Sequence, residues 1–316
     1  MTPELSIIIP LYNEIEVIEI CHQRVSDVLN KLDLEYEIIY VDDGSQDKSA
    51  EYISNLARND ARVKAILLSR NFGKEAALSA GFDYVQGELT IILDADLQDP
   101  PELIPEMLKT YEEKDVDTIL MKRTQRDGES AAKKQSAYWF YRILNKLSDF
   151  HIPEDVGDFR LMNRKSLDAL KKLPERNRYT KGLFAWIGMD TYVMHYQRDP
   201  RVAGVAKQNY TSLFKLAFEG ISSFSIHPLR ISTILGIVSA LFGFVFGIYI
   251  ALKSLILGDP VSGYPSTMAI ITFLGGAQLL GIGIVGEYIG KTYIESKQRP
   301  IYLIKKLVSK KEMNEK

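Results

Sequence analysis

The chain has 316 residues, a formal net charge of −2 and a hydrophobic content of 46%. This length allows one large domain with an appendage, or two domains, and the near-neutral charge gives no general indication of a nucleic-acid partner. The single cysteine, Cys21, excludes an intramolecular disulfide and fits a reducing compartment. The N-terminus has no basic segment followed by an apolar core, so no signal peptide is expected.

Short apolar runs alternate with helix-period segments from the first residue to about residue 120. Five runs of branched apolar residues predict strands at 5–9, 36–41, 63–68, 89–93 and 118–121. The segments between them predict helices at about 14–32, 48–58, 74–85 and 101–114. Strands that alternate with helices indicate an α/β fold whose mostly parallel sheet is covered on both faces.

Polar residues gather where four of these strands end. They are Pro10–Glu14, Asp42–Ser45, Asn71–Lys74 and the pair Asp94 and Asp96. The strand ends of a parallel sheet lie along one edge, and ligands of open α/β sheets bind there. We therefore expect these four clusters to converge on one crevice.

Asp94 and Asp96 follow the buried strand at 89–93, and the two-residue period of an extended chain places them on the same side. Neighbouring carboxylates repel each other, so the pair favours a bound divalent cation. Oxygen ligands suit Mg²⁺ or Mn²⁺, completed by water and substrate phosphates. The alternative is a polar turn, in which aspartate is common.

A metal-binding acid pair in an α/β crevice suggests a nucleotide-diphosphate ligand, because the cation would stabilise the departing diphosphate. Asp42 and Asp43 could accept hydrogen bonds from a base or a ribose, or could simply form a turn. Lys122, Arg123 and Arg126 could hold phosphates, although a short basic run is usually a solvated face.

The second half of the chain contains two long uncharged runs. Before them, residues 155–162 and 191–197 predict strands, 164–187 a helix, and 210–224 an amphipathic helix lying on a membrane or packed in a domain. The runs at 231–252 and 267–286 are each long enough to cross a hydrocarbon core of about 30 Å. They predict a transmembrane hairpin, with two buried core helices as the alternative.

Basic residues are concentrated after the second run. They are Lys291, Lys297, Arg299, Lys305, Lys306, Lys310 and Lys311. The positive-inside rule then places the main domain and both termini in the cytoplasm, as in a multi-pass protein of the inner (plasma) membrane. The expected organisation is a catalytic domain at 1–207, an interfacial helix at 208–228, a hairpin at 229–291 and a basic tail at 292–316.

Five motifs occur in a fixed order along the chain. They are Pro10-Leu11-Tyr12-Asn13-Glu14, Val41-Asp42-Asp43-Gly44-Ser45, Arg70-Asn71-Phe72-Gly73-Lys74, Asp94-Ala95-Asp96-Leu97-Gln98-Asp99-Pro100-Pro101 and Gly157-Asp158-Phe159-Arg160. Together they resemble the GT-A glycosyltransferases of family 2, in the branch that makes polyprenyl-phosphate sugars, such as bactoprenol glucosyltransferases and dolichol-phosphate mannose synthases. The resemblance covers about residues 4–225, and the paired spans extend it to nearly the whole chain.

This resemblance implies a GT-A (Rossmann-like) domain that transfers one sugar, with inversion, from a nucleotide diphosphate to a polyprenyl phosphate at the cytoplasmic membrane face. By position, the implied nucleotide-sugar site consists of Pro10, Tyr12, Glu14, Asp42, Lys74, Asp94, Gln98 and Asp99. Asp96 and Asp94 would bind Mg²⁺ or Mn²⁺, and Asp158 stands where the family has its proposed catalytic acid or base. Asp94, Asp96 and Asp158 are thus the expected catalytic residues.

The acceptor phosphate has to be held against the negative charge of the donor. The candidate cations are Arg123, Arg126, Arg201 and Lys207. The segment around the last two departs from the family pattern, which has a serine where this chain has Ala206. A lipid monophosphate is already largely ionised at pH 7, with a second pKa near about 6, so Asp158 could instead orient Arg160 or the acceptor.

The two-span hairpin and the Gly-Asp-Phe-Arg context look most like the bacterial glucosyl branch, so UDP-glucose is the expected donor. UDP-aminoarabinose, UDP-N-acetylhexosamine and GDP-mannose stay open, and related enzymes suggest a tetramer. A processive polysaccharide glycosyltransferase is disfavoured because the chain lacks a Gln-x-x-Arg-Trp motif and further spans. A catalytically silent scaffold that binds a nucleotide sugar is the remaining alternative.

Overall fold

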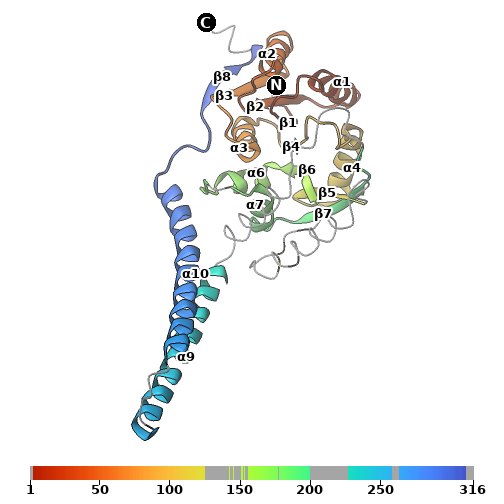
Figure 1. The fold of residues 1–316 in the computed structure, drawn as a ribbon. Coiled ribbons are helices and arrows are strands. Elements are labelled where there is room, and N and C mark those ends of the chain that lie inside the picture. The colour runs from red at the N-terminus through yellow and green to blue at the C-terminus, as the bar shows by residue number, and fades with distance from the viewer. Residues whose placement is uncertain are drawn as a thin grey trace.

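The computed structural model describes residues 3–124, 142, 145, 151, 153, 156–176, 178–199, 227–257 and 263–310. Its strands are β1 (Leu5–Leu11), β2 (Tyr36–Asp42), β3 (Val63–Leu68), β4 (Leu89–Ile92), β5 (Thr118–Arg123), β6 (Val156–Asn163), β7 (Thr191–Tyr196) and β8 (Ile304–Val308). They form one eight-stranded sheet in the order β7-β5-β6-β4-β1-β2-β3-β8 (Figure 1). β6 and β8 run antiparallel to their neighbours and the other pairs are parallel, so the expected mostly parallel sheet is confirmed.

Helices cover both faces of this sheet. They are α1 (Ile18–Leu29), α2 (Ser49–Asn59), α3 (Lys74–Tyr84), η1 (Pro101–Leu103) with α4 (Ile104–Lys114), α6 (Arg164–Lys171) and α7 (Thr180–Trp186). Along β1, Ile7 and Ile9 belong to the core shared with α1, α2 and α4, whereas Ile8 belongs to the core shared with α3, α6 and α7. All seven residues of β1 are buried, as expected for the central strand of a sheet covered on both sides.

The helix expected over 164–187 is two helices. α6 ends at Lys171 and α7 begins at Thr180, and Pro174 lies in the gap. Proline has no backbone N–H to donate and disfavours helical backbone at the residue before it, so the chain leaves the helix there. The break matters for the site because it turns the N-terminus of α7 towards α3.

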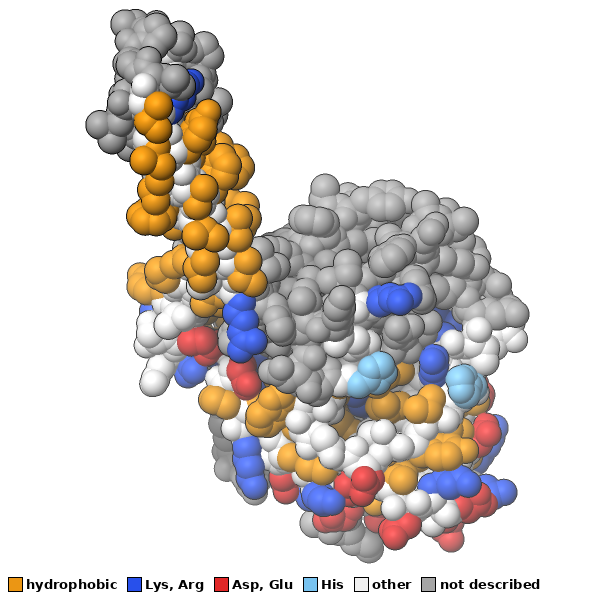
Figure 2. All heavy atoms as spheres, turned by 90° about the horizontal axis from the view of Figure 1, so that it is seen from below, with side chains coloured by type: hydrophobic (Ala, Val, Ile, Leu, Met, Phe, Trp, Pro, Cys, Tyr) orange, Lys and Arg blue, Asp and Glu red, His pale blue; other side chains and the backbone are white. Residues whose placement is uncertain are grey.

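Two long helices, α9 (His227–Leu257) and α10 (Tyr264–Ser296), form a hairpin that projects from the α/β body (Figure 1). Apolar side chains cover its outer surface (Figure 2). Within the described residues, Phe273–Ser296 is long and apolar enough to cross a membrane, and the apolar stretch Ser232–Phe246 is shorter. Two helices are therefore present where two were expected, and a double membrane crossing stays a prediction. The amphipathic helix expected at 210–224 lies outside the described residues.

The chain returns from α10 to the body and adds β8 to the sheet edge. β8 pairs antiparallel with β3, and Val308 is buried. Tyr302 donates a hydrogen bond to Asp83 at 2.6 Å, and Lys310 Nζ donates to the Asn59 carbonyl at 3.2 Å. The sequence reading treated this part of the chain only as a basic tail and missed the strand.

Candidate active site

The site lies where β1, β2, β3, β4 and β5 end, along a single edge of the sheet. β6 runs in the opposite direction, so its first residues lie at the edge where β4 ends. Ile92 pairs with Arg160, and continuing this antiparallel register by two residues sets Asp158 opposite Asp94. The antiparallel direction of β6 thereby brings Asp94 and Asp158, which are far apart in the sequence, next to each other.

Lys74 lies between these two carboxylates. Its Nζ is 2.6 Å from Asp94 Oδ1 and 2.6 Å from Asp158 Oδ2. Two carboxylates facing each other repel, and the ammonium group offsets that repulsion. Burial by itself lowers the pKa of Lys74, but the charges of Asp158 and Asp94 outweigh burial and hold the pKa above its ordinary value.

Asp158 responds in the opposite sense. Burial alone would raise its pKa, but the positive charges of Lys74 and Lys181 prevail and hold the pKa well below its usual range. Asp158 is therefore ionised at neutral pH. Arg160 does not pair with the Asp158 carboxylate: its Nη2 donates to the Gly157 carbonyl at 2.8 Å and its Nε to the Asp158 main-chain carbonyl at 3.4 Å.

Asp94, Asp96 and Gln98 share the open side of the loop after β4. The chain turns at 95–97, with Leu97 at a φ of 56°, so this is not the extended chain that the period-two argument assumed. Burial nevertheless alternates: Ala95 and Leu97 are buried and the three polar residues are half-buried. Asp96 Oδ1 accepts a hydrogen bond from the Gln98 N–H at 3.2 Å.

The donor set at this loop suits a hard divalent cation. Within the described residues, no group of three His, Cys, Asp or Glu side chains is placed to hold a metal without help. Mg²⁺ sites of nucleotide enzymes commonly use one or two carboxylates, with waters and substrate phosphates as the other ligands. Asp96 fits this pattern, and Asp94 fits it less well because one of its oxygens is bound to Lys74.

The neighbouring acids Asp42 and Asp43 have different partners. Asp43 accepts hydrogen bonds from the Phe72 N–H at 2.7 Å and the Gly73 N–H at 2.8 Å, so both of its oxygens hold the loop before α3. Asp42 is also buried, and its Oδ2 accepts from the Ser45 N–H at 3.1 Å. Its Oδ1 is buried without a hydrogen-bond partner among the described residues. Asp42 is thus the acid of the pair that is left to accept from a ligand.

The loops after β1 and β2 are joined by hydrogen bonds. The Asn13 N–H donates to Ser45 Oγ at 2.8 Å, and the Glu14 N–H donates to Ser49 Oγ at 3.0 Å. Asn13 has a positive φ of 54°, a conformation that asparagine tolerates better than most residues. Pro10 is buried at the end of β1, whereas Tyr12 and Glu14 are half-buried beside it.

Asp99 is held inside the protein. It is 1% exposed, accepts a hydrogen bond from the Tyr196 hydroxyl and lies 3.4 Å from Arg198 Nε. Arg123 extends towards the start of β6, because a Cβ added to Gly157 would lie 3.1 Å from Arg123 Nη2. Burial lowers the pKa of Arg123, but Tyr196 and the nearby acids raise it overall. The other expected acceptor cations, Arg126, Arg201 and Lys207, lie outside the described residues.

Two charged residues of the site had no role in the sequence analysis. Glu75 Oε2 accepts a hydrogen bond from the Thr180 N–H at 3.1 Å and so joins α3 to α7. Burial, together with the charge of Asp158, raises the pKa of Glu75 to about 7. Lys181 follows in α7, and burial lowers its pKa although Asp158 raises it. Glu75 could have been suspected from its place beside Lys74, whereas nothing local marks Lys181.

Comparison with known proteins covers both parts of the chain. Residues 6–171 match the model of glycosyl transferase family 2, and residues 227–292 match the GtrB C-terminal hairpin. An uncharacterized glycosyltransferase of Synechocystis sp. is 46% identical over 97% of this chain and 96% of its own. The bactoprenol glucosyl transferase of Shigella phage SfV is 44% identical over 96% of this chain and 98% of its own. The prophage bactoprenol glucosyl transferase homolog of Escherichia coli is 44% identical over 96% and 99%, respectively.

Proposed function

This chain belongs to glycosyl transferase family 2 and is a glycosyltransferase, and from that premise we propose that it transfers one sugar from a nucleotide diphosphate to a polyprenyl phosphate. The observation that carries the proposal is the Asp94–Lys74–Asp158 bridge beside Asp96, at the ligand-binding edge of the sheet. Likeness over nearly the whole chain to proteins named bactoprenol glucosyl transferase supports the lipid acceptor and a glucosyl donor.

On the donor side, Tyr12, Glu14 and Asp42 would line the nucleotide pocket beside β1 and β2. The unpartnered Oδ1 of Asp42 would accept a hydrogen bond from the base. This hydrogen bond would remove the free-energy penalty of a buried acceptor without a partner. Asp96, assisted by Asp94, would hold Mg²⁺ or Mn²⁺, which would offset the charge on the departing diphosphate. Gln98 would lie beside the sugar. Asp99 would contribute indirectly, by fixing the loop after β4 through its hydrogen bond with Tyr196.

On the acceptor side, the phosphate would attack the anomeric carbon from the face opposite the diphosphate, which inverts that carbon. We infer that Asp158 orients the site and does not take a proton in this step. Its pKa is held well below that of a lipid monophosphate, whose second pKa is about 6, so proton transfer to it is unfavourable. Its ionised carboxylate instead keeps Lys74 in place, and Lys74 and Arg123 offset the charge of the acceptor.

The hairpin of α9 and α10 would anchor the enzyme in the membrane, with the catalytic domain and both termini in the cytoplasm. The longer apolar stretch, Phe273–Ser296, supports the membrane anchor. The tetramer suggested by related enzymes stays a prediction.

The test is a transfer assay with purified protein in liposomes that contain undecaprenyl phosphate. Mg²⁺ or Mn²⁺ and a panel of UDP-glucose, UDP-aminoarabinose, UDP-N-acetylhexosamine and GDP-mannose are added, and the lipid product is identified by mass spectrometry. We expect a hexosyl-phosphoryl-lipid from UDP-glucose that disappears with EDTA and returns with the metal. A product from another donor would correct the choice of sugar and keep the reaction.

Asp96→Asn tests the metal-binding role, and Asp27→Asn, an exposed acid on α1, is its matched control. We expect the first variant to lose turnover and the second to keep it. If no donor gives a lipid product while nucleotide still binds, the chain is a silent nucleotide-sugar-binding protein and the proposed function is wrong.

A further inference from the structure

A cavity of about 120 Å³ lies between α7 and the part of the sheet formed by β5, β6 and β7. Its apolar lining includes Leu120, Val156, Met162, Phe184 and Ile187, and polar atoms contribute nearly as much of the wall. Two cations, Arg160 and Lys181, also line it. Cations beside apolar side chains in a partly enclosed space are an unusual combination, because burying a cation without an anionic partner is costly.

The cavity lies beside Asp158 of the bridge. Val156, Asp158, Arg160 and Met162 alternate along β6 and therefore lie on one face of the sheet. Three of these four residues line the cavity, and Asp158 is the fourth. The cavity thus lies against the face of β6 that carries Asp158, and the residues on either side of Asp158 on that face, Val156 and Arg160, line it.

The two cations are not equivalent. Arg160 is fixed by two main-chain carbonyls and its guanidinium lies 3.5 Å from the centre of the Phe184 ring. Lys181 forms no ion pair within the described part of the chain, and its positive charge helps to lower the pKa of Asp158. Lys181 is therefore the cation that remains available to an anionic ligand.

The position of the cavity suits one substrate of the proposed reaction. The donor pocket lies by β1 and β2, and the cavity lies across β4 and β6 from it. The donor side and the cavity thus flank β4 and β6, the two strands that carry Asp94 and Asp158 of the bridge. Figure 1 also shows α7 and β7 on the side of the body from which the hairpin extends.

We propose that this cavity binds the head of the acceptor lipid, with its phosphate at Lys181 and its first isoprene unit against the apolar walls. This inference rests on the proposed function. A volume of about 120 Å³ is small beside the roughly 300–1,000 Å³ of pockets that enclose whole drug-sized ligands, so only the head of the lipid would fit. Lys181 is a binding residue in this scheme and takes no part in bond making.

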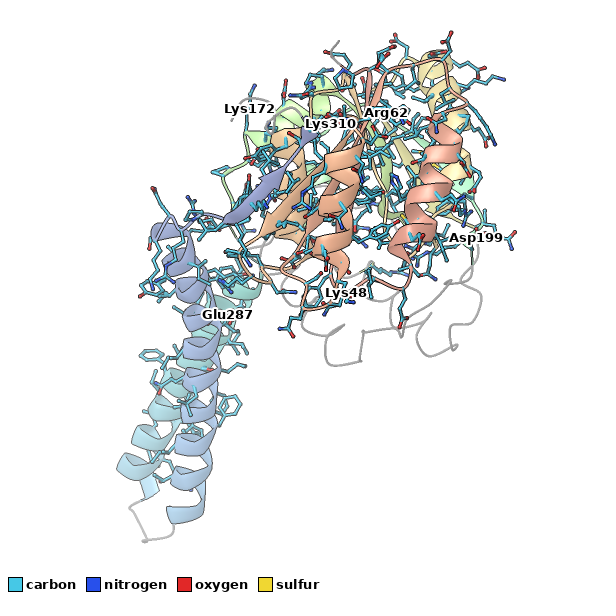
Figure 3. All side chains as sticks on the ribbon, turned by 90° about the horizontal axis from the view of Figure 1, so that it is seen from above. Lys48, Arg62, Lys172, Asp199, Glu287 and Lys310 are labelled. Atoms are coloured by element: carbon cyan, nitrogen blue, oxygen red, sulfur yellow. The ribbon has the colours of Figure 1, made fainter. Side chains whose placement is uncertain are left out.

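Two substitutions test the two halves of the cavity separately. Lys181→Met removes the charge and keeps the length of the side chain, and Ala185→Phe fills the space below α7. Lys172→Met, at an exposed lysine labelled in Figure 3, is the control. Initial rates are measured against undecaprenyl phosphate and against the nucleotide sugar, and thermal unfolding shows that each variant is folded.

We expect both site variants to raise the KM for the lipid phosphate by about tenfold or more. Lys181→Met would lose one charge-assisted hydrogen bond, and Ala185→Phe would lose the apolar contact with the lipid. The KM for the donor should stay within about twofold of wild type, and the control should match wild type in both. An unchanged lipid KM in folded Lys181→Met and Ala185→Phe protein would overturn the proposal.

A binding measurement without donor keeps this proposal separate from the proposed function. Farnesyl phosphate and inorganic phosphate are titrated into the wild-type protein and into both variants. We expect farnesyl phosphate to bind more tightly than inorganic phosphate, and Ala185→Phe to weaken only the former. Equal affinities would indicate a free-phosphate site and overturn the lipid assignment, whereas failure of transfer with these affinities intact would overturn only the proposed function.

Discussion

Replacing Lys74 by methionine should separate the stability of this protein from its activity. The substitution leaves Asp94 and Asp158 facing each other without the ammonium group that now lies 2.6 Å from each. Their repulsion then raises the pKa of one of them and moves both side chains. We expect turnover to fall about tenfold to a hundredfold, which is about 1.4–2.7 kcal/mol of transition-state stabilisation.

The stability cost should be smaller than for a fully buried ion pair. Removing one partner of such a pair costs about 3–5 kcal/mol. The Lys74 side chain is 43% exposed, and solvent screens its interactions, so we expect a loss of about 1–2 kcal/mol in unfolding free energy.

Lys64→Met is the matched comparison, because it also removes a lysine from an ion pair. Lys64 lies 2.7 Å from Glu37, with side chains 17% and 5% exposed, on strands β3 and β2 away from the bridge. We expect this variant to lose about 3 kcal/mol of stability and to keep its turnover when it is assayed well below its melting temperature. Thermal unfolding in detergent and the transfer assay measure both quantities. Equal losses of activity in the two variants would refute the reasoning.

Three further substitutions or deletions have defined outcomes. The pKa of Glu75 is raised from 4.5 to about 7, so the folded state loses stability as pH rises through that interval, and Glu75→Gln should raise the melting temperature more at about pH 8 than at about pH 5. Equal shifts in melting temperature at both pH values would contradict this. Asp43→Asn should cost about 1–3 kcal/mol in denaturant unfolding, because its amide nitrogen cannot accept from the Phe72 or Gly73 N–H; an unchanged midpoint would contradict the loop contact. Deleting residues 303–316 should expose the edge of β3 and cause concentration-dependent light scattering, and a monodisperse truncated protein would show that β8 does not protect that edge.

Local patterns predict most of the body of this fold. The five strands up to residue 121 are found within one or two residues of their expected ends, because runs such as Ile7–Ile9 must be buried on both faces of the sheet. β8 escapes such patterns. Its five residues include Lys305 and Lys306, and only pairing with β3, more than 230 positions away in sequence, makes it a strand.

The site likewise has a part that local sequence patterns predict and a part that they do not. The convergence of Asp42, Lys74 and Asp94 follows from parallel strands, and the structure brings these residues to one edge as expected. The contact of Asp158 with Lys74 does not follow, because alternation along β6 is the same whichever way the strand runs. The position of Lys181 is determined by the break between α6 and α7. That break follows from Pro174 and from the hydrogen bond between Glu75 and the Thr180 N–H.

The charges around the bridge nearly cancel before any substrate arrives. The acids are Glu75, Asp94, Asp96 and Asp158, and the cations are Lys74, Arg123, Arg160 and Lys181. A nucleotide diphosphate and a lipid phosphate would each bring further negative charge, so a balanced site cannot attract both without more cations. A divalent ion at Asp96 would supply the additional positive charge for the donor, and Lys181, which has no ion-pair partner among the described residues, would face the acceptor. In the proposed scheme, the separation of these two positive centres, and not the basicity of Asp158, would set the direction of attack.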